Sequence, residues 1–559
     1  MNDTHNNDAD SSTMRPAELA IQTEVIRSAL VAAAEEMSVT VWRTSRSSVV
    51  REILDYSTCV FDANGDSVAQ AARMPVHLNS MASCLRDLID HHVPLAQWAD
   101  GDVILTNDPY SGGQHLPDLQ TFSPVFQQGR RVAIVGILVH HLDVGGGAPG
   151  SYDANATEIF QEGICFPPVR IIKRGELNED LLKVFLRNTR DPDNVGGDFD
   201  SQLAALRIGI RSVIRIAERY GAREVEDACT RIQSQSEQAM RSAIAAVPDG
   251  IYGFHDFVDD DGLDSGPIRV QARLDIRGDT ACIDLTGSAN QVPGPVNCTL
   301  NMSSSAVVCA VLMAIGRDIP ANAGCYRPLT VTAPPGTVVN ASRPAAVANR
   351  MAVGHRVVNV VMGCFAKALP AEVPAAYYGV SYAYALQAHC EDGTRPVYFD
   401  LECGGWGAHP REDGASGFSC GFHNVSNSPV EMIEQDYPIS FQCYALVPDS
   451  GGRGRTRGGL GLAREFRLDA PAGQFAANLD RFAVPPYGLN GGEPGGAGRL
   501  LLKRADGTHT ELGSKVRSVA LRRGDSIRLE TSGGGGFGDP RARASTDIEA
   551  DRLAGYITH

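Results

Sequence analysis

The sequence lacks an apolar run long enough to cross a membrane. Its richest apolar window, Ala306 to Ile315, falls well short of the ~20 residues that a transmembrane helix needs. The first residues, Met1 to Ser12, are rich in Asp, Asn and Thr and carry neither the basic flank nor the apolar stretch of a secretion signal. We therefore expect a disordered polar tail over residues 1–13 and a cytoplasmic protein that does not associate with membranes.

Positive charge is also scarce. The chain of 559 residues has 50 Lys and Arg against 66 Asp and Glu, which gives a formal net charge of −16. Nucleic acids and anionic lipid surfaces select for basic faces, so neither is expected as the main partner. Hydrophobic residues make up 43% and charged residues 21% of the chain, as in packed globular proteins, which excludes a wholly disordered chain.

Two local motifs are missing. None of the 13 cysteines forms a CxxC pair, which favours reduced, buried thiols over the alternatives of disulfides or a thiolate metal site. The phosphate-binding pattern GxxxxGK[ST] is absent as well. We therefore expect no nucleotide-binding site of that type.

Apolar periodicity predicts both helices and strands. The pattern indicates helices over 15–45, 79–93, 177–188 and 198–245, a hairpin over 56–70 and a buried strand over 131–140. The 58 glycines and 31 prolines argue against an all-helical protein. These observations predict an α+β, multi-domain fold, with a mixed α/β N-terminal half and a strand- and glycine-rich C-terminal half.

Three domains are expected after the tail. A break at Pro248-Asp249-Gly250 separates an α/β domain over 14–247, which carries the candidate metal site, from a mixed α/β middle domain over 248–370. A β-rich domain follows over 371–559. Its glycine run Gly533–Gly536 fits either an anion-binding loop or tight backbone packing, and packing is favoured.

Two short His/Asp clusters are the main candidates for chemistry. His115 and Asp118 end a polar loop, whereas His140 and Asp143 lie where an apolar strand runs into glycines. The intervening residues 119–139 suit a strand–loop–strand unit that brings the two clusters side by side. Imidazole and carboxylate ligands suit Zn²⁺, Mn²⁺ or Fe²⁺, and such an ion activates water. The alternative is that these polar residues simply cap strand ends.

Strand alternation complicates the second cluster. It places His141 and Asp143 on one face and His140 on the other, so a site that contains both His140 and Asp143 requires a bend. The adjoining glycines permit one. Both histidines therefore stay open as ligands.

Further carboxylates are candidates for proton transfer. Asp55 is a third carboxylate candidate, unless it forms a salt bridge to Arg51 or Arg46. Glu158 and Glu162 suit general bases, with a solvated helix face as the alternative.

Long motifs in a fixed order run along nearly the whole chain. They are Asp55-Tyr56-Ser57, Pro75 to Met81, Gly101 to Tyr110, His115 to Asp118, His140 to Gly146, Pro149-Gly150-Ser151, Thr157 to Pro168, Asp449 to Gly452 and Gly533 to Pro540. Together they resemble the hydantoinase B/oxoprolinase family. That family includes B-type subunits of ATP-dependent hydantoinases, a caprolactamase subunit, a domain of 5-oxoprolinase and the alpha subunit of acetone carboxylase.

The resemblance implies a metal site and a partner. It implies that a divalent metal (Zn, Mn or Fe) is held by the His and Asp residues of these motifs, His115, Asp118, His140 and Asp143. Asp55 is a possible fifth ligand and His141 the alternate for His140. Some relatives have Thr where this chain has Gln114, a departure whose effect on the loop stays open. The implied partner is a hydantoinase A-type ATPase subunit, through which ATP is used to phosphorylate the substrate's amide oxygen.

The implied activity is that of a B-type catalytic subunit of an ATP-dependent cyclic amidohydrolase. A metal-activated water would attack the phosphorylated ring amide of a hydantoin, lactam or oxoproline-like substrate, with Glu158 or Asp55 taking the proton. The alternative is a subunit of an ATP-dependent ketone carboxylase of the acetone or acetophenone type, although that alpha subunit is considerably longer than 559 residues. A non-catalytic structural subunit is the third interpretation.

Overall fold

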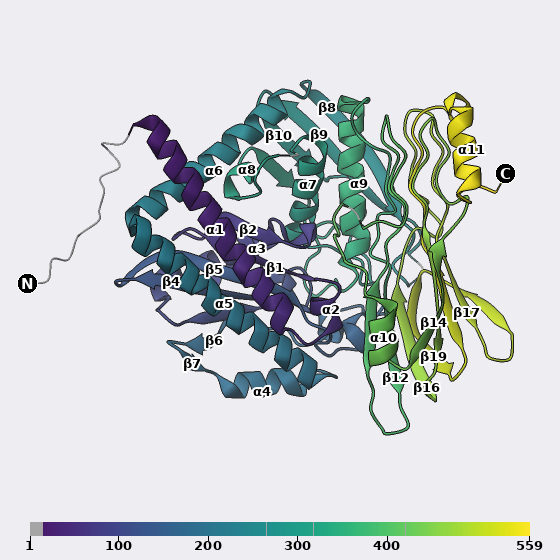
Figure 1. Ribbon diagram of the computed structural model, residues 1–559, viewed down its shortest axis with the longest axis horizontal. Helices are drawn as coiled ribbons and strands as arrows, with labels where there is room; N and C mark the ends of the chain where they lie inside the picture. Colours follow the sequence, from purple (N-terminus) through teal and green to yellow (C-terminus); the bar gives the residue numbers. More distant parts are fainter. Residues whose placement is uncertain (1–14, 264, 317, 420, 559) are drawn as a thin grey trace, which may run out of the picture.

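The computed structural model describes residues 15–558 except 264, 317 and 420, so the tail expected over 1–13 lies outside the described residues. Long helices lie at one end of the molecule and strand-rich sheets at the other, with α9 (Arg350–Ala368) between them (Figure 1). The combination of helices and several sheets confirms the predicted α+β class. Within the described part, no helix combines the length and the apolar character that a membrane crossing requires.

The N-terminal half is built on a seven-stranded sheet. Its strands, in spatial order, are β2 (Ser67–Ala72), β1 (Tyr56–Phe61), β5 (Arg130–His140), β4 (Asp118–Gln127), β3 (Val103–Thr106), β6 (Val169–Lys173) and β7 (Glu176–Leu177). All neighbouring strands are antiparallel. The buried strand expected over 131–140 is β5, at the third position of this sheet.

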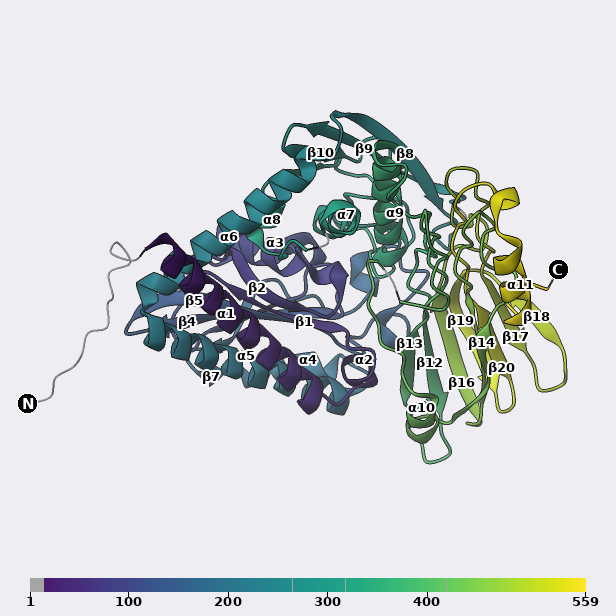
Figure 2. The same ribbon diagram turned by 45° about the horizontal axis from the view of Figure 1, so that its top comes forward.

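Helices cover both faces of this sheet. One face packs against the long helices α1 (Pro16–Thr44), α5 (Pro192–Tyr220) and α6 (Ala222–Ala245), with α4 (Glu179–Arg187) beside α5. The opposite face packs against α3 (Ser80–Asp87), which continues into the turn η3 (Leu88–His92), and α7 (Leu300–Ile315) lies beyond α3 (Figure 2). The sheet is therefore buried on both sides, which explains its near-continuous apolar strands.

Local chemistry accounts for the helix boundaries. Pro16 starts α1, where its fixed φ suits the first turn, and Ile26, Leu30 and Met37 recur on the buried face. The prediction of a single helix over 198–245 is wrong, because the structure has two helices there. Gly221 has φ 88°, a left-handed conformation that ends α5 and separates it from α6.

The middle of the chain forms a smaller sheet with three helices. Its strands, in spatial order, are β11 (Leu329–Thr332), β10 (Thr280–Asp284), β9 (Ile268–Arg277) and β8 (Gly250–Val258). The helices are α7, the short α8 (Ala323–Tyr326) and α9, whose first seventeen residues, Arg350 to Ala366, are all buried. Because α9 packs on α7, β8 and β9, it carries residues from this sheet into the centre of the molecule.

The C-terminal half contains two further sheets. One has the order β13 (Val397–Leu401), β12 (Ala383–His389), β16 (Ala472–Asn478) and β19 (Lys515–Arg522). The other has the order β14 (Ile439–Leu446), β15 (Leu462–Leu468), β20 (Ser526–Glu530), β17 (Arg499–Lys503) and β18 (His509–Leu512). Two short helices, α10 (Val430–Asp436) and α11 (Ser545–Leu553), were not expected from the strand and turn signals of this region.

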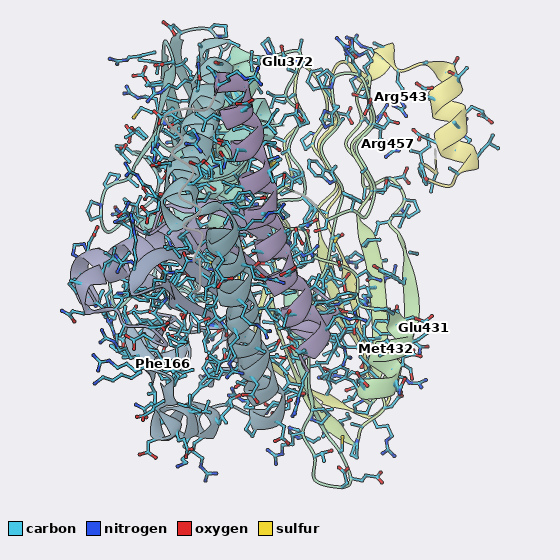
Figure 3. The ribbon with its side chains drawn as sticks, turned by 60° about the vertical axis from the view of Figure 1, so that its left-hand side comes forward. Phe166, Glu372, Glu431, Met432, Arg457 and Arg543 are labelled. Atoms are coloured by element: carbon cyan, nitrogen blue, oxygen red, sulfur yellow. The ribbon has the colours of Figure 1, made fainter. Side chains whose placement is uncertain are left out.

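Glycine-rich segments pack backbone against backbone beside these sheets. Gly534 donates its N–H to the carbonyl of Gly459, and a Cβ at Gly534 would lie 1.8 Å from the carbonyl oxygen of Trp406. No side chain fits there, so close packing accounts for the run Gly533–Gly536. Arg457 and Arg543 then fix α11 against these segments, because both bind Asp551 (Figure 3).

Each of the four sheets draws all its strands from one of the three segments predicted as domains. The hydrophobic core, however, crosses the proposed boundaries. A single cluster of buried side chains joins Val49 and Leu142 of the N-terminal half, Val357 of α9 and Phe466 of the C-terminal half. The candidate site lies where these parts meet.

Candidate metal centre

The site is built on a row of three residues at one end of the seven-stranded sheet. Asp118 on β4 lies directly opposite His140 on β5. The N–H of His140 donates to the carbonyl of Asp55, which immediately precedes β1, at 3.1 Å. Directly opposed residues of antiparallel strands point to the same face. The sheet therefore presents an imidazole between two carboxylates on one face.

His115 completes a triangle with the first two residues of this row. Its Nε2 atom lies 2.9 Å from Oδ1 of Asp118 and 3.1 Å from Nδ1 of His140. The third edge, from His140 Nδ1 to Asp118 Oδ1, is 3.0 Å. Zinc and similar ions bind such atoms at ~2.1 Å, so adjacent ligands at right angles lie ~3 Å apart. The spacing of these three buried atoms therefore fits one side of a metal coordination shell.

A hydrogen-bonded loop holds His115 in place. Asn107 donates from Nδ2 to the carbonyl of Leu116 at 2.6 Å, and the carbonyl of His115 accepts from the N–H of Asp118 at 3.1 Å. Gln114 donates from Nε2 to the carbonyl of Val76 at 2.8 Å. The loop is thereby fixed before any ligand binds.

Asp55 and His77 extend the cluster. Oδ2 of Asp55 lies 3.8 Å from Nδ1 of His140, and its Oδ1 lies 3.7 Å from Nε2 of His77. Ser57, the next residue on the same face of β1, lies with Oγ 2.9 Å from Nδ1 of His77. His77 was not predicted as a site residue. The only sequence signal for it is its place in the motif Pro75 to Met81.

Arg350 was also not predicted, and no local pattern points to it. It is the first residue of α9, separated by 232 positions from Asp118, whose Oδ2 accepts a hydrogen bond from its Nη2 at 2.8 Å. The side chain is buried, and its Nε and Nη1 atoms have no acceptor within the part of the chain that the structure describes. An unsatisfied buried donor costs about 1–3 kcal/mol, more when charged. Such a cost indicates that these two nitrogen atoms of Arg350 bind a ligand or ordered water.

The aromatic rings of Phe399, from the C-terminal half, and of Tyr152 close one side of the site. The ring of His140 stacks on Phe399 of β13 at a centroid distance of 5.8 Å. Tyr152 lies between them and the loop, with its ring 5.8 Å from that of His115. Because these walls are apolar, the charged groups of the site are poorly hydrated, which strengthens their mutual interactions.

Burial and charge set the protonation states of the cluster. Burial lowers the pKa of His115 to about 3 and also lowers the pKa of His77. Burial alone would raise the pKa of Asp118, but His115 and Arg350 outweigh it and hold that pKa well below its usual range. At neutral pH, His115 therefore keeps a free lone pair and Asp118 its charge, as metal ligation requires.

The acidity of Asp55 differs from that of Asp118. Burial raises the pKa of Asp55, although the neighbouring His140 and His77 oppose this effect. The surroundings thus shift the pKa values of these two neighbouring carboxylates in opposite directions. That is the usual condition for one carboxylate to act as a fixed charge and the other as a proton acceptor.

Asp143 does not lie in this cluster, contrary to the ligand set expected from the motifs. Its Oδ1 accepts from the N–H of Gly145 and of Arg190, and its Oδ2 from the N–H of Gly150 and from Nη1 of Arg190, all at 2.9–3.1 Å. Four donors therefore occupy both oxygens. Asp143 shapes the glycine loop beyond β5, and the bend that would bring it beside His140 does not occur.

His141 lies on the opposite face from His140, as strand alternation predicts. Its Nε2 lies 3.4 Å from Oε1 of Gln202 on α5, and its ring packs edge-on against Phe185. His140, and not His141, belongs to the triangle.

Glu158 is exposed and does not reach the cluster. Its backbone N–H donates to Oε1 of Gln161 at the start of the short helix η7 (Ile159–Gln161). Glu162, in contrast, is buried, and its Oε1 accepts from the N–H groups of Val347 and Ala348 at 2.8 and 2.7 Å. Burial raises its pKa to about 8.

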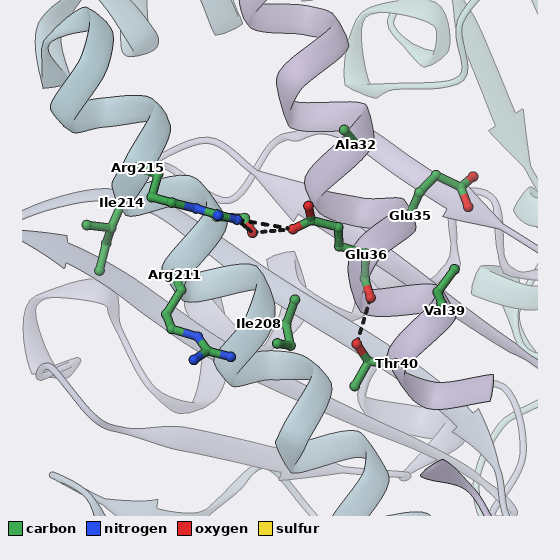
Figure 4. Close-up of a pocket in the computed structure, with 10 residues that line it drawn as sticks. Ala32, Glu35, Glu36, Val39, Thr40, Ile208, Arg211, Ile214 and Arg215 are labelled. Carbon is green, nitrogen blue, oxygen red and sulfur yellow. Dashed lines mark hydrogen bonds and ion pairs between the residues drawn. The ribbon is translucent and has the colours of Figure 1, made fainter. Parts of the chain in front are cut away.

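Two surface pockets lie outside the triangle. A groove of about 900 Å³ between α1 and α5, lined among others by Glu36, Thr40 and Arg215, contains none of the predicted site residues (Figure 4). A second pocket, of about 430 Å³, is lined among others by Leu54, the chain neighbour of Asp55.

Comparison with known proteins places the chain in context. The family model described as hydantoinase B/oxoprolinase matches residues 20–540. The caprolactamase subunit beta of Pseudomonas jessenii is 31% identical, over 98% of this chain and 95% of that protein. The crystal structure of the ATP-dependent caprolactamase from the same organism aligns with a TM-score of 0.91 at 29% identity, over 98% of this chain and 95% of that one. The nucleotide-free structure of an acetone carboxylase also aligns with a TM-score of 0.91, at 19% identity, over 97% of this chain and 78% of that one. That protein therefore has the same fold.

Proposed function

The chain belongs to the hydantoinase B/oxoprolinase family, and on that premise we propose that it is the hydrolytic subunit of an ATP-dependent enzyme that opens cyclic amides. The family includes ATP-dependent hydrolases of this class, such as caprolactamase. The observation that carries the proposal is the buried triangle of His115, Asp118 and His140, whose three facing atoms lie 2.9–3.1 Å apart.

The donor set fits a divalent transition metal. The ligand atoms of His115, Asp118 and His140 all lie close enough together to share one ion. Two imidazoles and one carboxylate match the preferences of Zn²⁺, Mn²⁺ and Fe²⁺. His115, Asp118 and His140 would hold the ion, with Asp55 and His77 beside it. When bound, such an ion supplies Lewis acidity and lowers the pKa of water.

We assign proton transfer to Asp55. Its carboxylate faces both His140 and His77, and burial raises its pKa toward the range that general bases use. The substrate is the ring amide after its oxygen has received a phosphoryl group. Water oxygen bonds to the ring carbon, the carbon–nitrogen bond breaks, and both protons of that water reach the released nitrogen by way of Asp55.

The product of that step is an acyl phosphate, which a second water cleaves. The oxygen of the second water bonds to the acyl carbon, the bond from that carbon to the phosphate oxygen breaks, and Asp55 again accepts the proton. Carboxylate and inorganic phosphate leave. Phosphorylation thus makes ring opening irreversible, which a five-membered lactam otherwise resists by closing again.

A partner subunit is proposed to supply the phosphoryl group. The relative from P. jessenii is named as a subunit, and this chain has no phosphate-binding loop of the GxxxxGK[ST] type. We propose a hydantoinase A-type ATPase as that partner.

Sequence identity to the solved relatives, and the share of each relative's chain that aligns, favour hydrolysis over ketone carboxylation. The likeness to caprolactamase covers 95% of that chain at 29% identity, whereas the likeness to acetone carboxylase covers 78% at 19%. Carboxylation at the same metal is the second candidate, because both structures share this fold.

The test combines the chain with its partner ATPase, ATP and Mn²⁺ or Zn²⁺. Hydantoin, caprolactam and 5-oxoproline are offered separately, and the ring-opened acid and phosphate are quantified by NMR. ATP-dependent ring opening by the wild-type protein, lost in His140→Ala, is the expected result. Incorporation of labelled bicarbonate into a ketone substrate, without any ring opening, would replace this proposal by the carboxylase.

A further inference from the structure

The guanidinium of Arg350 is only partly used by the protein. The side chain is buried, and one nitrogen, Nη2, donates to Oδ2 of Asp118. The Tyr152 hydroxyl lies close enough to the guanidinium for Arg350 to oppose the rise of its pKa on burial. Nε and Nη1 nevertheless form no hydrogen bond of standard geometry with the described residues, although nearly all buried donors in proteins are paired. A fixed cation with free donors therefore stands directly behind a metal-binding carboxylate.

A second unsatisfied group lies along the same strand. Gln120 follows Asp118 by two positions on β4, so both side chains point to the same face of the sheet. It is fully buried, and neither its Oε1 nor its Nε2 has a hydrogen-bond partner in the described structure. The sheet thus offers an additional polar group on the face that carries the triangle. Unpaired buried amides of this kind indicate a ligand or ordered water.

The charge of the site favours an anion. A divalent ion contributes two positive charges and Arg350 one, whereas Asp55 and Asp118 contribute two negative charges. A net charge of about +1 in a buried site attracts an oxyanion, and a guanidinium with free N–H groups matches phosphate geometry.

We propose that Arg350 binds the phosphoryl group of the activated substrate through Nε and Nη1, while Nη2 keeps Asp118 in place. This inference rests on the function proposed above. In the last step the bond between the acyl carbon and the phosphate oxygen breaks, and its electron pair passes to that oxygen. Arg350 stabilises the additional negative charge of the departing phosphate. It therefore acts on the leaving group.

The test measures phosphate binding to the full-length chain loaded with Mn²⁺, without substrate or partner. Inorganic phosphate is titrated while the Mn²⁺ spectrum is followed by electron paramagnetic resonance, and metal content is measured by mass spectrometry. Arg350→Lys keeps one donor and the charge, Arg350→Gln removes the charge, and the exposed Arg343→Lys is the matched control. We expect wild type and Arg343→Lys to bind phosphate equally, and both Arg350 variants to retain Mn²⁺ but bind phosphate at least tenfold more weakly.

Two results would overturn the inference. In one, the wild-type chain loaded with Mn²⁺ does not bind phosphate. In the other, the Arg350 variants lose Mn²⁺ affinity while any Mn²⁺-loaded fraction binds phosphate normally, which would make Arg350 a positioning residue for Asp118 alone. Because no amide enters this experiment, its outcome is independent of hydrolysis. Phosphate binding that depends on Arg350 without amide turnover would overturn the proposed function and leave the anion site standing.

Discussion

Asp118 and His140 face each other across the antiparallel strands β4 and β5, with Oδ1 and Nδ1 3.0 Å apart. This pairing exists only in one register, because a slip of one residue would turn one side chain to the other face of the sheet. The turn between Gln127 and Arg130 and the apolar residues on both faces fix that register. The geometry of the candidate metal site is therefore a consequence of how the sheet folds.

The first prediction separates His140, which belongs to the triangle, from Asp143, which lies outside it. His140→Ala removes one corner of the triangle and should weaken metal binding by roughly 100-fold or more, beyond the 10–100-fold typical of changes to outer-shell groups. Asp143→Asn should leave metal binding unchanged, because the oxygens of Asp143 are already bound to Arg190 and to backbone N–H groups. Equilibrium dialysis with Mn²⁺ or Zn²⁺ measures both. Loss of metal in Asp143→Asn with an intact fold would return Asp143 to the ligand set.

The second prediction concerns the proton acceptor. Asp55→Asn should retain the metal and lower kcat by roughly 10²–10⁴-fold, the usual contribution of a general base. Asp55 works in its ionised form, so wild-type activity should rise with pH through its raised pKa, and that limb should vanish in the variant. Rates are measured with the partner ATPase between pH 5 and pH 9.

Glu158→Gln is the matched control for Asp55→Asn. Glu158 is an exposed carboxylate, so its loss should leave kcat and the pH profile unchanged. A normal rate in Asp55→Asn together with a large loss in Glu158→Gln would reverse the assignment.

The third prediction links Glu162 to stability. Burial raises its pKa from 4.5 to about 8, so between these values the folded protein keeps a proton that the unfolded chain releases. This group therefore stabilises the fold most at low pH, and its contribution is lost as pH rises toward 8. In Glu162→Gln the amide oxygen can still accept from Val347 and Ala348, but no charge develops.

The measurement is the melting temperature of both proteins at pH 5.5 and pH 8.5. We expect the melting temperature of Glu162→Gln, relative to that of the wild type, to be higher at pH 8.5 than at pH 5.5. A difference in melting temperature that is the same at both pH values would show that Glu162 is ionised in the folded protein throughout this range.

The parts of the fold that the sequence predicts are those with local causes. The helix over 15–45 and the strand over 131–140 follow from apolar periodicity within one segment, and the structure has them as α1 and β5. The sequence also predicts that His115 lies close to His140, because only one strand–loop–strand unit separates them. In contrast, Gly221 ends α5 because of its backbone angle, which a helical pattern of side chains does not reveal.

Residues that reach the site from distant elements were not predictable. Arg350 comes from the start of α9 and Phe399 from a C-terminal strand, and neither has a local pattern that indicates chemistry. The ligand set that included Asp143 depended on a bend that the glycines permit. Backbone N–H groups and Arg190 bind Asp143 instead, an outcome that only the tertiary structure could reveal.

The last prediction tests why the C-terminal half is so rich in glycine. Gly534→Ala would place a Cβ 1.8 Å from the carbonyl oxygen of Trp406, where the neighbouring atoms are backbone and cannot move aside singly. Gly513→Ala is the matched control, since nothing lies within 4 Å of its Cβ position. We expect Gly534→Ala to destabilise the protein by about 3 kcal/mol or more, at or above the usual range for overpacking, and Gly513→Ala to have little effect. Chemical denaturation followed by tryptophan fluorescence measures both, because Trp406 lies in the affected layer. Equal stability of the two variants would mean that the glycine segments can separate without cost, and close backbone packing would then not explain why the run contains only glycine.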